Sequence, residues 1–230
     1  MSATTLSIAD KVARLTLDDG KANVFDNAMF DAVGAAIDEA DAAKAVLVLR
    51  GRPGRFSGGY DLKTLSSSPE AARALVKRGS DLAIRFMERP HPVLLASDGH
   101  CVALGAFLFL GADYRIGAKG GAAGDFKVGL PETPFNLPMH NFGRELATHA
   151  LPKRMFKRAF IQGEFFADPV EAGFYDEVAE DMDAAIDAKL AYLTQINTPT
   201  FANNKALAHK RILPVLKQAA EEDLSLGLEF

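Results

Sequence analysis

The sequence contains one cysteine and no tryptophan among its 230 residues. A single thiol can form neither an internal disulfide nor the paired thiolates of a typical structural zinc site, so we expect a cytoplasmic protein. Positive charge is also scarce, because 26 Lys and Arg residues stand against 30 Asp and Glu residues, for a net charge of -4. Binding to a phosphate backbone needs a concentrated basic surface, so we expect no nucleic-acid partner.

Long apolar runs are absent as well. The longest, at residues 101–112, is about half of the roughly 20 residues that a bilayer crossing needs, and it contains two glycines. The first 17 residues alternate polar and apolar types and have neither the basic nor the apolar region of a signal peptide. We therefore expect no membrane partner. The composition, 48% hydrophobic and 24% charged, is typical of one globular domain.

Strand and helix patterns alternate along the first half of the chain. Residues 6–8 and 12–17 alternate with period two and predict a β-hairpin. Asp26 stands where it can cap a following helix, and residues 45–49 form the continuous apolar run of a buried parallel strand. The glycines of residues 51–59 then predict a loop at the carboxyl end of that strand, where α/β folds bind ligands.

The same pattern repeats further along. Residues 69–88 predict a helix closed by prolines, and residues 93–97 predict a second buried strand that ends in a turn at 98–99. Residues 102–110 are apolar on all sides and predict a buried helix, and residues 114–116 predict another strand.

The C-terminal third is predicted to be helical. A mobile loop at 117–124 precedes a capped start at Asp168-Pro169, a helix from about Asp181 and an amphipathic tail from Thr200. We therefore predict an α/β fold with a core at residues 1–195 and a helical extension at 196–230.

Three segments contain residues that suit catalysis. The first, residues 55–62, has two adjacent glycines that free the backbone to point an N–H group outward, as in an oxyanion donor. It has neither the third glycine of a dinucleotide loop nor the Gly-Lys-Ser/Thr ending of a P-loop. An ordinary Gly-rich turn is the alternative interpretation.

The second segment, residues 98–107, leads into the predicted buried helix, whose first N–H groups have no intrahelical acceptor. An N–H near Leu104 facing one near Tyr60 would give the two donors that an enolate needs, whereas plain core packing is the alternative. In the third segment, residues 127–134, apolar and proline neighbours would desolvate Glu132 and raise its pKa toward that of a useful base. A surface glutamate is the alternative there.

In this order and at these separations, the three segments resemble the crotonase superfamily, also called the enoyl-CoA hydratase/isomerase family. The resemblance covers most of the chain and implies a spiral of repeated ββα units. It implies that Glu132 is catalytic and that the N–H groups of Tyr60 and Leu104 hold the oxygen of a thioester enolate. It further implies that coenzyme A, as part of an acyl-CoA substrate, binds around the first segment. The implied substrate-binding residues are Gly58, Gly59, Asp61, Leu62, Phe107 and His140.

Departures from the family pattern narrow the predicted reaction. Hydratases of this type hold water between two glutamates, and Phe107 stands at the position of the first. The resembling isomerases keep only the second, which is Glu132 here, so we expect a 3-enoyl-CoA to 2-enoyl-CoA isomerase. Ala103 and Leu104 replace two of three family glycines, and Asn136 replaces another.

Two other functions stay open. One is a different crotonase reaction, namely hydration, thioester hydrolysis or decarboxylation, with Glu132 or His140 as the base. The other is a catalytically silent protein that binds acyl-CoA.

The resemblance also implies a homotrimer or a hexamer, with the extension at 196–230 serving as an assembly element or as part of the same domain. We expect no metal and no separate cofactor, because the five histidines lack ligand spacing. Cys101 stands among apolar residues and is predicted to be a buried structural thiol.

Overall fold

The computed structural model describes residues 3–119 and 126–225, whose strands form two sheets. The larger sheet has six strands in the order β1-β2-β3-β5-β7-β9, with only the β1–β2 pair antiparallel. The smaller sheet has three parallel strands in the order β4-β6-β8. The strands are β1 (Thr4–Ala9), β2 (Val12–Leu17), β3 (Val46–Arg50), β4 (Gly54–Ser57), β5 (Val93–Ser97), β6 (Gly99–Val102), β7 (Tyr114–Ala118), β8 (Val128–Gly129) and β9 (Glu177–Ala179).

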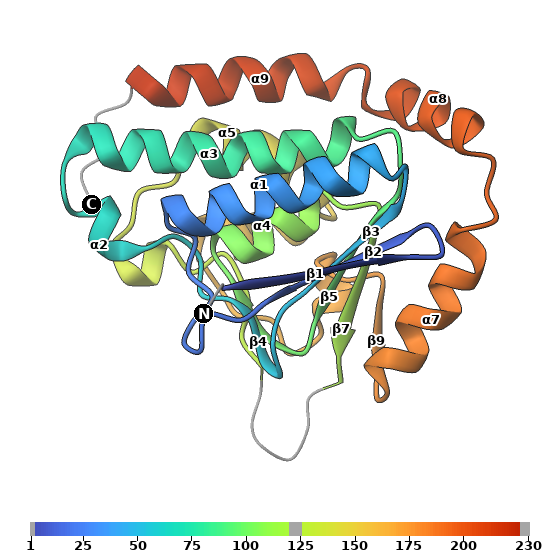
Figure 1. Cartoon of the computed structure of the whole chain (residues 1–230). Coiled ribbons are helices and arrows are strands. Elements are labelled where there is room, and N and C mark those ends of the chain that lie inside the picture. The colour runs from blue at the N-terminus through green and yellow to red at the C-terminus, as the bar shows by residue number, and fades with distance from the viewer. Residues whose placement is uncertain (1–2, 120–125, 226–230) are drawn as a thin grey trace.

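Helices cover the larger sheet and form the C-terminal part of the described chain (Figure 1). The α-helices are α1 (Asn27–Ala42), α2 (Leu62–Leu65), α3 (Pro69–Glu88), α4 (Leu104–Leu110), α5 (Asn141–Ala150), α6 (Pro169–Ala172), α7 (Met182–Leu193), α8 (Thr198–His209) and α9 (Ile212–Glu222). Short 3-10 turns occur at Thr133–Phe135 and Asp223–Ser225, and a π-helical turn occurs at Lys157–Ile161.

A ββα unit recurs along the chain. β3 and β4 precede α3, β5 and β6 precede α4, and β7 and β8 precede α5. In each unit the first strand joins the six-stranded sheet and the second joins the three-stranded sheet. The second strands of successive units therefore pair side by side, which stacks the loops that follow them on one side of the molecule.

The predicted helix starts are found where capping residues stand. The Asp26 carboxylate accepts the Met29 N–H at 2.8 Å at the start of α1. Helix α3 begins with Pro69 after the capping residue Ser68 and ends before Pro90, as predicted. Asp168 caps α6, and Asp181 caps α7.

Two boundaries predicted around the second unit are wrong. Gly99, expected in a turn, begins β6, and Val102, expected in the buried helix, ends that strand before α4 begins at Leu104. β6 has four residues, and an apolar run this short gives no periodicity that separates strand from helix. Tertiary pairing decides here, because a Cβ on Gly99 would lie 2.0 Å from the Gly54 carbonyl carbon of β4.

The strands β4, β8 and β9 were not predicted. β4 lies inside the segment expected to be only a loop, and β8 lies in the segment of Glu132, for which no strand was predicted. β9 interrupts the C-terminal third that was expected to be helical. Each has four residues or fewer, so they form by pairing with β6 and β7 rather than from a pattern of their own. Most of the predicted mobile loop at 117–124 lies outside the described residues, and residues 117 and 118 belong to β7.

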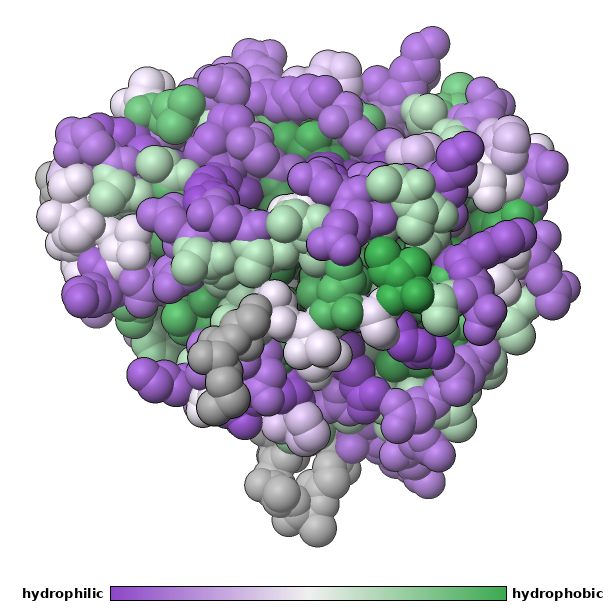
Figure 2. Space-filling view, viewed as in Figure 1, coloured by the Kyte–Doolittle hydropathy of each residue, from purple (hydrophilic) through white to green (hydrophobic). Residues whose placement is uncertain are grey.

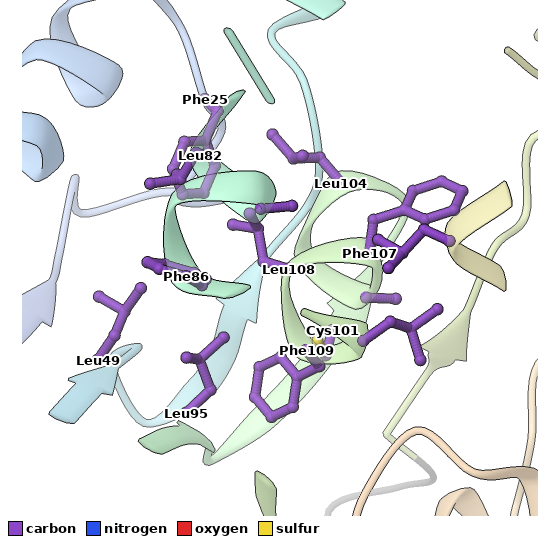
Figure 3. Close-up of a cluster of buried hydrophobic side chains, with 14 of the residues drawn as sticks. Phe25, Leu49, Leu82, Phe86, Leu95, Cys101, Leu104, Phe107, Leu108 and Phe109 are labelled. Atoms are coloured by element: carbon purple, nitrogen blue, oxygen red, sulfur yellow. The ribbon is translucent and has the colours of Figure 1, made fainter. Parts of the chain in front are cut away.

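Helix α4 lies in the centre of the main core, and all seven of its residues are buried. Phe109 packs edge to face against Phe56 at 4.8 Å between ring centroids. Figure 3 shows α4 surrounded by side chains from α3 and from strands of the larger sheet, among them Leu82, Phe86 and Leu95. Because α4 is packed on all sides, its first turn, which begins at Leu104, is held in one orientation.

The C-terminal helices pack on two sides of the core. Helix α9 contacts α3 and α5, while α7 covers a second apolar cluster on β2, β3, β5 and β7 (Figure 1). The face seen in Figure 2 carries mainly hydrophilic residues with apolar patches between them. Within the described residues, no helix is both long enough and apolar enough to cross a membrane.

Candidate active site

Glu132 follows β8 and is 8% exposed. Its carbonyl oxygen accepts the N–H groups of Phe135 and Leu137, which closes a tight turn around it. Its Oε2 atom has no hydrogen-bond partner among the described residues. Burial raises the pKa of the Glu132 carboxyl to about 7, because the charged form has lost its hydration. Such a group can take or give a proton near neutral pH.

The Glu132 side chain lines a small cavity of about 50 Å³. Four other residues singled out from the sequence line it as well, namely Gly58, Tyr60, Leu62 and His140. The remaining lining residues were not predicted and come from α2, α3, the start of α4 and the turn after Glu132: Leu65, Val76, Ala103, Leu137 and Pro138. These five are apolar, which accounts for the raised pKa of Glu132.

A larger hollow of about 630 Å³ lies between α3 and α9, with the end of α1 beside it. Its charged groups neutralise one another: Lys77 pairs with Asp81 and Glu221, and Lys217 pairs with Glu88. It therefore offers solvated ion pairs, whereas the smaller cavity offers an unpaired buried carboxyl. The chemistry favours the smaller cavity.

Two backbone N–H groups beside the cavity lack acceptors among the described residues. Phe25 bonds across to the neighbours of Tyr60, donating to Gly59 O at 2.8 Å and accepting from Asp61 N at 3.1 Å, which leaves the Tyr60 N–H free. Leu104 is the first residue of α4, so its N–H has no intrahelical acceptor. These are the two donors that the sequence singled out.

Gly59 brings the two donor segments together. Its φ is +98°, and a Cβ at this position would lie 2.8 Å from the Ala103 Cβ and 3.5 Å from the Leu104 nitrogen. The backbone before Tyr60 thus packs directly on the start of α4, and only glycine fits. The N–H groups of Tyr60 and Leu104 are therefore held on adjoining segments of backbone.

Two positions where the sequence departs from family glycines keep a glycine-like backbone. Ala103 has φ +52° and ψ -125°, and Asn136 has φ +56° and ψ +32°. Asparagine tolerates the left-handed region, whereas alanine at positive φ is strained. The turns are thus retained at both positions, with stored strain at Ala103 next to the Leu104 donor.

The remaining singled-out residues have other contacts. The Tyr60 hydroxyl donates to the Val76 carbonyl at 3.3 Å, and burial raises its pKa, so this side chain stays protonated. The Asp61 carboxylate caps α2, accepting from Thr64 N at 2.9 Å and Thr64 Oγ1 at 2.7 Å. Asp61 therefore positions the loop rather than lining the cavity.

Phe107 is 1% exposed and packs near the His140 ring. Its ring centroid is 5.5 Å from that of His140, which lines the cavity at the head of α5. The Nδ1 atom of His140 accepts the Gly143 N–H at 3.0 Å and lies 3.4 Å from Asp223 Oδ2. Asp223 was missed because it is more than 80 residues away in sequence, with no local signal that links it to His140.

No group of three or more histidine, cysteine or acidic side chains that suits a metal occurs in residues 3–119 and 126–225. Cys101 is buried, and burial raises the pKa of its thiol, which keeps it protonated and unreactive.

Comparison with known proteins shows the family of this chain. The sequence model described as enoyl-CoA hydratase/isomerase matches residues 7–222. The crystal structure of an enoyl-CoA hydratase/isomerase family protein from Pseudomonas syringae matches this chain with a TM-score of 0.94. The two sequences are 40% identical, and the match covers 98% of each chain. The chain belongs to the enoyl-CoA hydratase/isomerase family, and the predicted crotonase-like α/β fold is confirmed.

Curated relatives include both reaction types. A probable enoyl-CoA hydratase from Bacillus subtilis is 31% identical over 136 residues, which are 57% of this chain and 51% of the relative. The human mitochondrial enoyl-CoA delta isomerase 1 is 25% identical over 192 residues, 81% of this chain and 63% of the relative. The chain thus spans between half and two thirds of these relatives, and their names do not separate isomerase from hydratase.

Proposed function

We propose that the protein is an enoyl-CoA isomerase that moves the double bond of a 3-enoyl-CoA to the 2-position. The observation that carries this proposal is Glu132, the one carboxyl in the lining of the small cavity as the described residues define it, with its pKa raised to about 7. At the position where family hydratases have a second glutamate stands Phe107, whose side chain can neither bind nor deprotonate water.

The reaction needs one base and one oxyanion site. Ionised Glu132 takes a proton from C2. The C–H electron pair forms a double bond between C1 and C2, and the π pair of the thioester carbonyl moves to its oxygen to give an enolate. The N–H groups of Tyr60 and Leu104 hold that oxygen. When the enolate collapses, Glu132 returns the proton at C4 and the double bond lies between C2 and C3. Loss of one such donor costs about 10²- to 10³-fold in rate.

Coenzyme A is proposed to bind along the loop of Gly58, Gly59, Asp61 and Leu62, which ends at an exposed leucine. The apolar lining of the cavity suits the acyl group and excludes water, which protects the conjugated product and keeps Glu132 basic. In this proposal the substrate brings its own coenzyme A, and the protein needs no metal and no separate cofactor.

The test is to incubate the purified protein separately with a 3-enoyl-CoA and a 2-enoyl-CoA and to identify products by mass and chromatography. We expect the 3-enoyl ester to give its 2-enoyl isomer without a gain of water. Glu132→Gln is expected to lower kcat by about 10²- to 10⁴-fold, the contribution of a positioned general base. Glu164→Gln removes a half-exposed carboxylate that is paired with Arg158 outside the cavity lining, and it serves as the matched control. Isomerisation that survives Glu132→Gln would refute the proposal.

Hydration is the second candidate function, and His140 is the observation that favours it. Its ring lines the same cavity as Glu132, and its Nε2 atom has no partner among the described residues. A water molecule held between the two would add to a 2-enoyl ester, so a product heavier by one water would support this function. Binding of acyl-CoA esters without turnover would instead identify a silent binding protein.

The assembly is a further proposal. Helices α8 and α9, with the rest of residues 196–230, are proposed to contribute to a homotrimer or a hexamer, and the molecular mass in solution tests this. The cytoplasmic location stays a prediction.

A further inference from the structure

The start of α5 is held by two side chains from distant parts of the sequence. Three consecutive N–H groups at this end have no intrahelical acceptor. Asp223 Oδ1 accepts from Asn141 N at 2.8 Å, and Asp223 Oδ2 accepts from Phe142 N at 3.0 Å. His140 Nδ1 accepts the third, from Gly143 N, at 3.0 Å. Each of the two Asp223 carboxylate oxygens therefore accepts one N–H group, and the His140 Nδ1 atom accepts the third.

This arrangement selects one form of the His140 ring. An Nδ1 atom that accepts a hydrogen bond through its lone pair carries no proton, so a neutral ring has its proton on Nε2. The 3.4 Å contact between Nδ1 and Asp223 Oδ2 is longer than a hydrogen bond. Asp223 is 2% exposed, and this burial acts to raise its pKa. The nearby His140 ring and the Phe142 and Asn141 amides outweigh burial and hold the pKa below the usual value, so Asp223 accepts both amides as a carboxylate.

Two aromatic rings also lie near the His140 ring. The Phe142 ring stacks on it at 6.2 Å between centroids and 14° between planes, and the Phe107 ring lies at 5.5 Å. The side chain is 8% exposed and lines the cavity with Glu132. Because Nδ1 is engaged at the helix start, Nε2 is the ring nitrogen left to serve the cavity.

We propose that Asp223, at the end of the C-terminal helices, is a positioning residue that holds His140 as an Nε2–H donor toward the cavity containing Glu132. The part of this inference that concerns catalysis rests on the proposed function. The part that concerns the ring does not. By taking two of the three amides, Asp223 fixes the first turn of α5 and leaves the His140 ring a single, directed bond. The helical extension thereby contributes to the site.

The ring is tested by nitrogen NMR of the full chain labelled with ¹⁵N-histidine, and the His140 signals are assigned by their loss in His140→Gln. In the wild-type protein we expect Nδ1 to have the shift of an acceptor nitrogen and Nε2 that of a protonated one. In Asp223→Ala we expect both shifts to move toward the average of the two tautomers. Asp223→Asn keeps an acceptor oxygen and is expected to restore part of the wild-type pattern.

Glu222→Gln is the matched control, because the side chain of this exposed neighbour accepts a hydrogen bond from the Gln218 amide and, among the described residues, has none to α5. We expect it to leave both the ring shifts and the kinetics unchanged. For Asp223→Ala we expect kcat to fall by about ten- to a hundredfold with KM nearly unchanged, the size of loss that follows small misplacement in a site.

Wild-type ring shifts in Asp223→Ala, or an Nδ1–H tautomer in the wild-type protein, would overturn the inference. If the proposed isomerase activity is absent but the ring shifts respond as expected, the proposed function fails and the positioning role stands.

Discussion

At the scale of single residues, Glu132 combines a gain in basicity with a loss in stability. The described residues give its Oε2 atom no donor, and the apolar cavity lining removes water from it. The same burial that makes the carboxylate a stronger base makes its ionised form unfavourable in the folded protein. The proposed proton transfer would make use of this basicity.

The pH dependence of stability follows from the pKa of Glu132, which is about 7 when folded against an ordinary value of 4.5. Between these values the folded protein keeps a proton that the unfolded chain has lost, so this group's stabilising contribution is present at low pH and is lost as pH rises. We therefore expect Glu132→Gln to raise the free energy of unfolding by about 3 kcal/mol at pH 8 and by about 1 kcal/mol at pH 5. Urea titrations at both values measure this, and an equal effect at both would contradict it.

At the scale of elements, α3 packs against the side chains of both donor residues, Tyr60 and Leu104. Gly79 lies in the middle of this helix, and a Cβ there would be 2.2 Å from the Tyr60 hydroxyl oxygen and 2.8 Å from Leu104 Cδ1. The helix thus approaches both segments as closely as a backbone without a side chain allows. A Cβ at Gly79 would therefore press on the side chains of both donor residues.

Gly79→Ala is therefore expected to destabilise the protein by about 1–3 kcal/mol through overpacking and to lower kcat by shifting both donors. Gly34→Ala in α1 is the matched control, since a Cβ there meets nothing within 4 Å. Alanine has the higher helix propensity, so we expect this control to stabilise the protein by about 0.5–1 kcal/mol with unchanged activity. Thermal unfolding and steady-state kinetics of both variants make the comparison. Equal stabilisation by the two substitutions would contradict overpacking, because it would show that a Cβ at Gly79 is accommodated without strain.

The sequence predicted the elements whose signals are local. Pro69 and Pro90 mark the two ends of α3, and a continuous apolar run marks β3. The short strands of the smaller sheet are recognisable only by their partners, and so is the contact of Asp223 with α5. Each of these depends on residues brought together by the whole fold, so no local pattern encodes it.

At the scale of the whole molecule, a buried ion pair attaches the helical extension to the core. Lys205 of α8 donates to Asp113 at 2.6 Å and to the Phe86 carbonyl at 2.7 Å, and Asp113 also accepts the Val93 N–H at 2.8 Å. Lys205 thus joins α8 to the end of α3 and, through Asp113, to the start of β5. Both side chains are largely buried, so each depends on the other for compensation of its charge.

Lys205→Ala is expected to lower the free energy of unfolding by about 3–5 kcal/mol, because it leaves Asp113 buried without its partner. Lys217→Ala removes a solvated ion pair with Glu88 in the same extension and is expected to cost less than about 1 kcal/mol. Denaturant titration compares the two. Similar losses would mean that α8 is held by its apolar contacts and not by this pair.

The capping of α5 by Asp223 also sets an order of events during synthesis. The ribosome releases a chain from its N-terminus, so the residues that line the cavity emerge before the carboxylate that caps Asn141 and Phe142. The core sheets can pair while α9 is still being made. A nascent chain in this state has the residues that line the cavity but lacks the hydrogen bonds from Asn141 and Phe142 to Asp223. The first turn of α5 is therefore capped only late in translation.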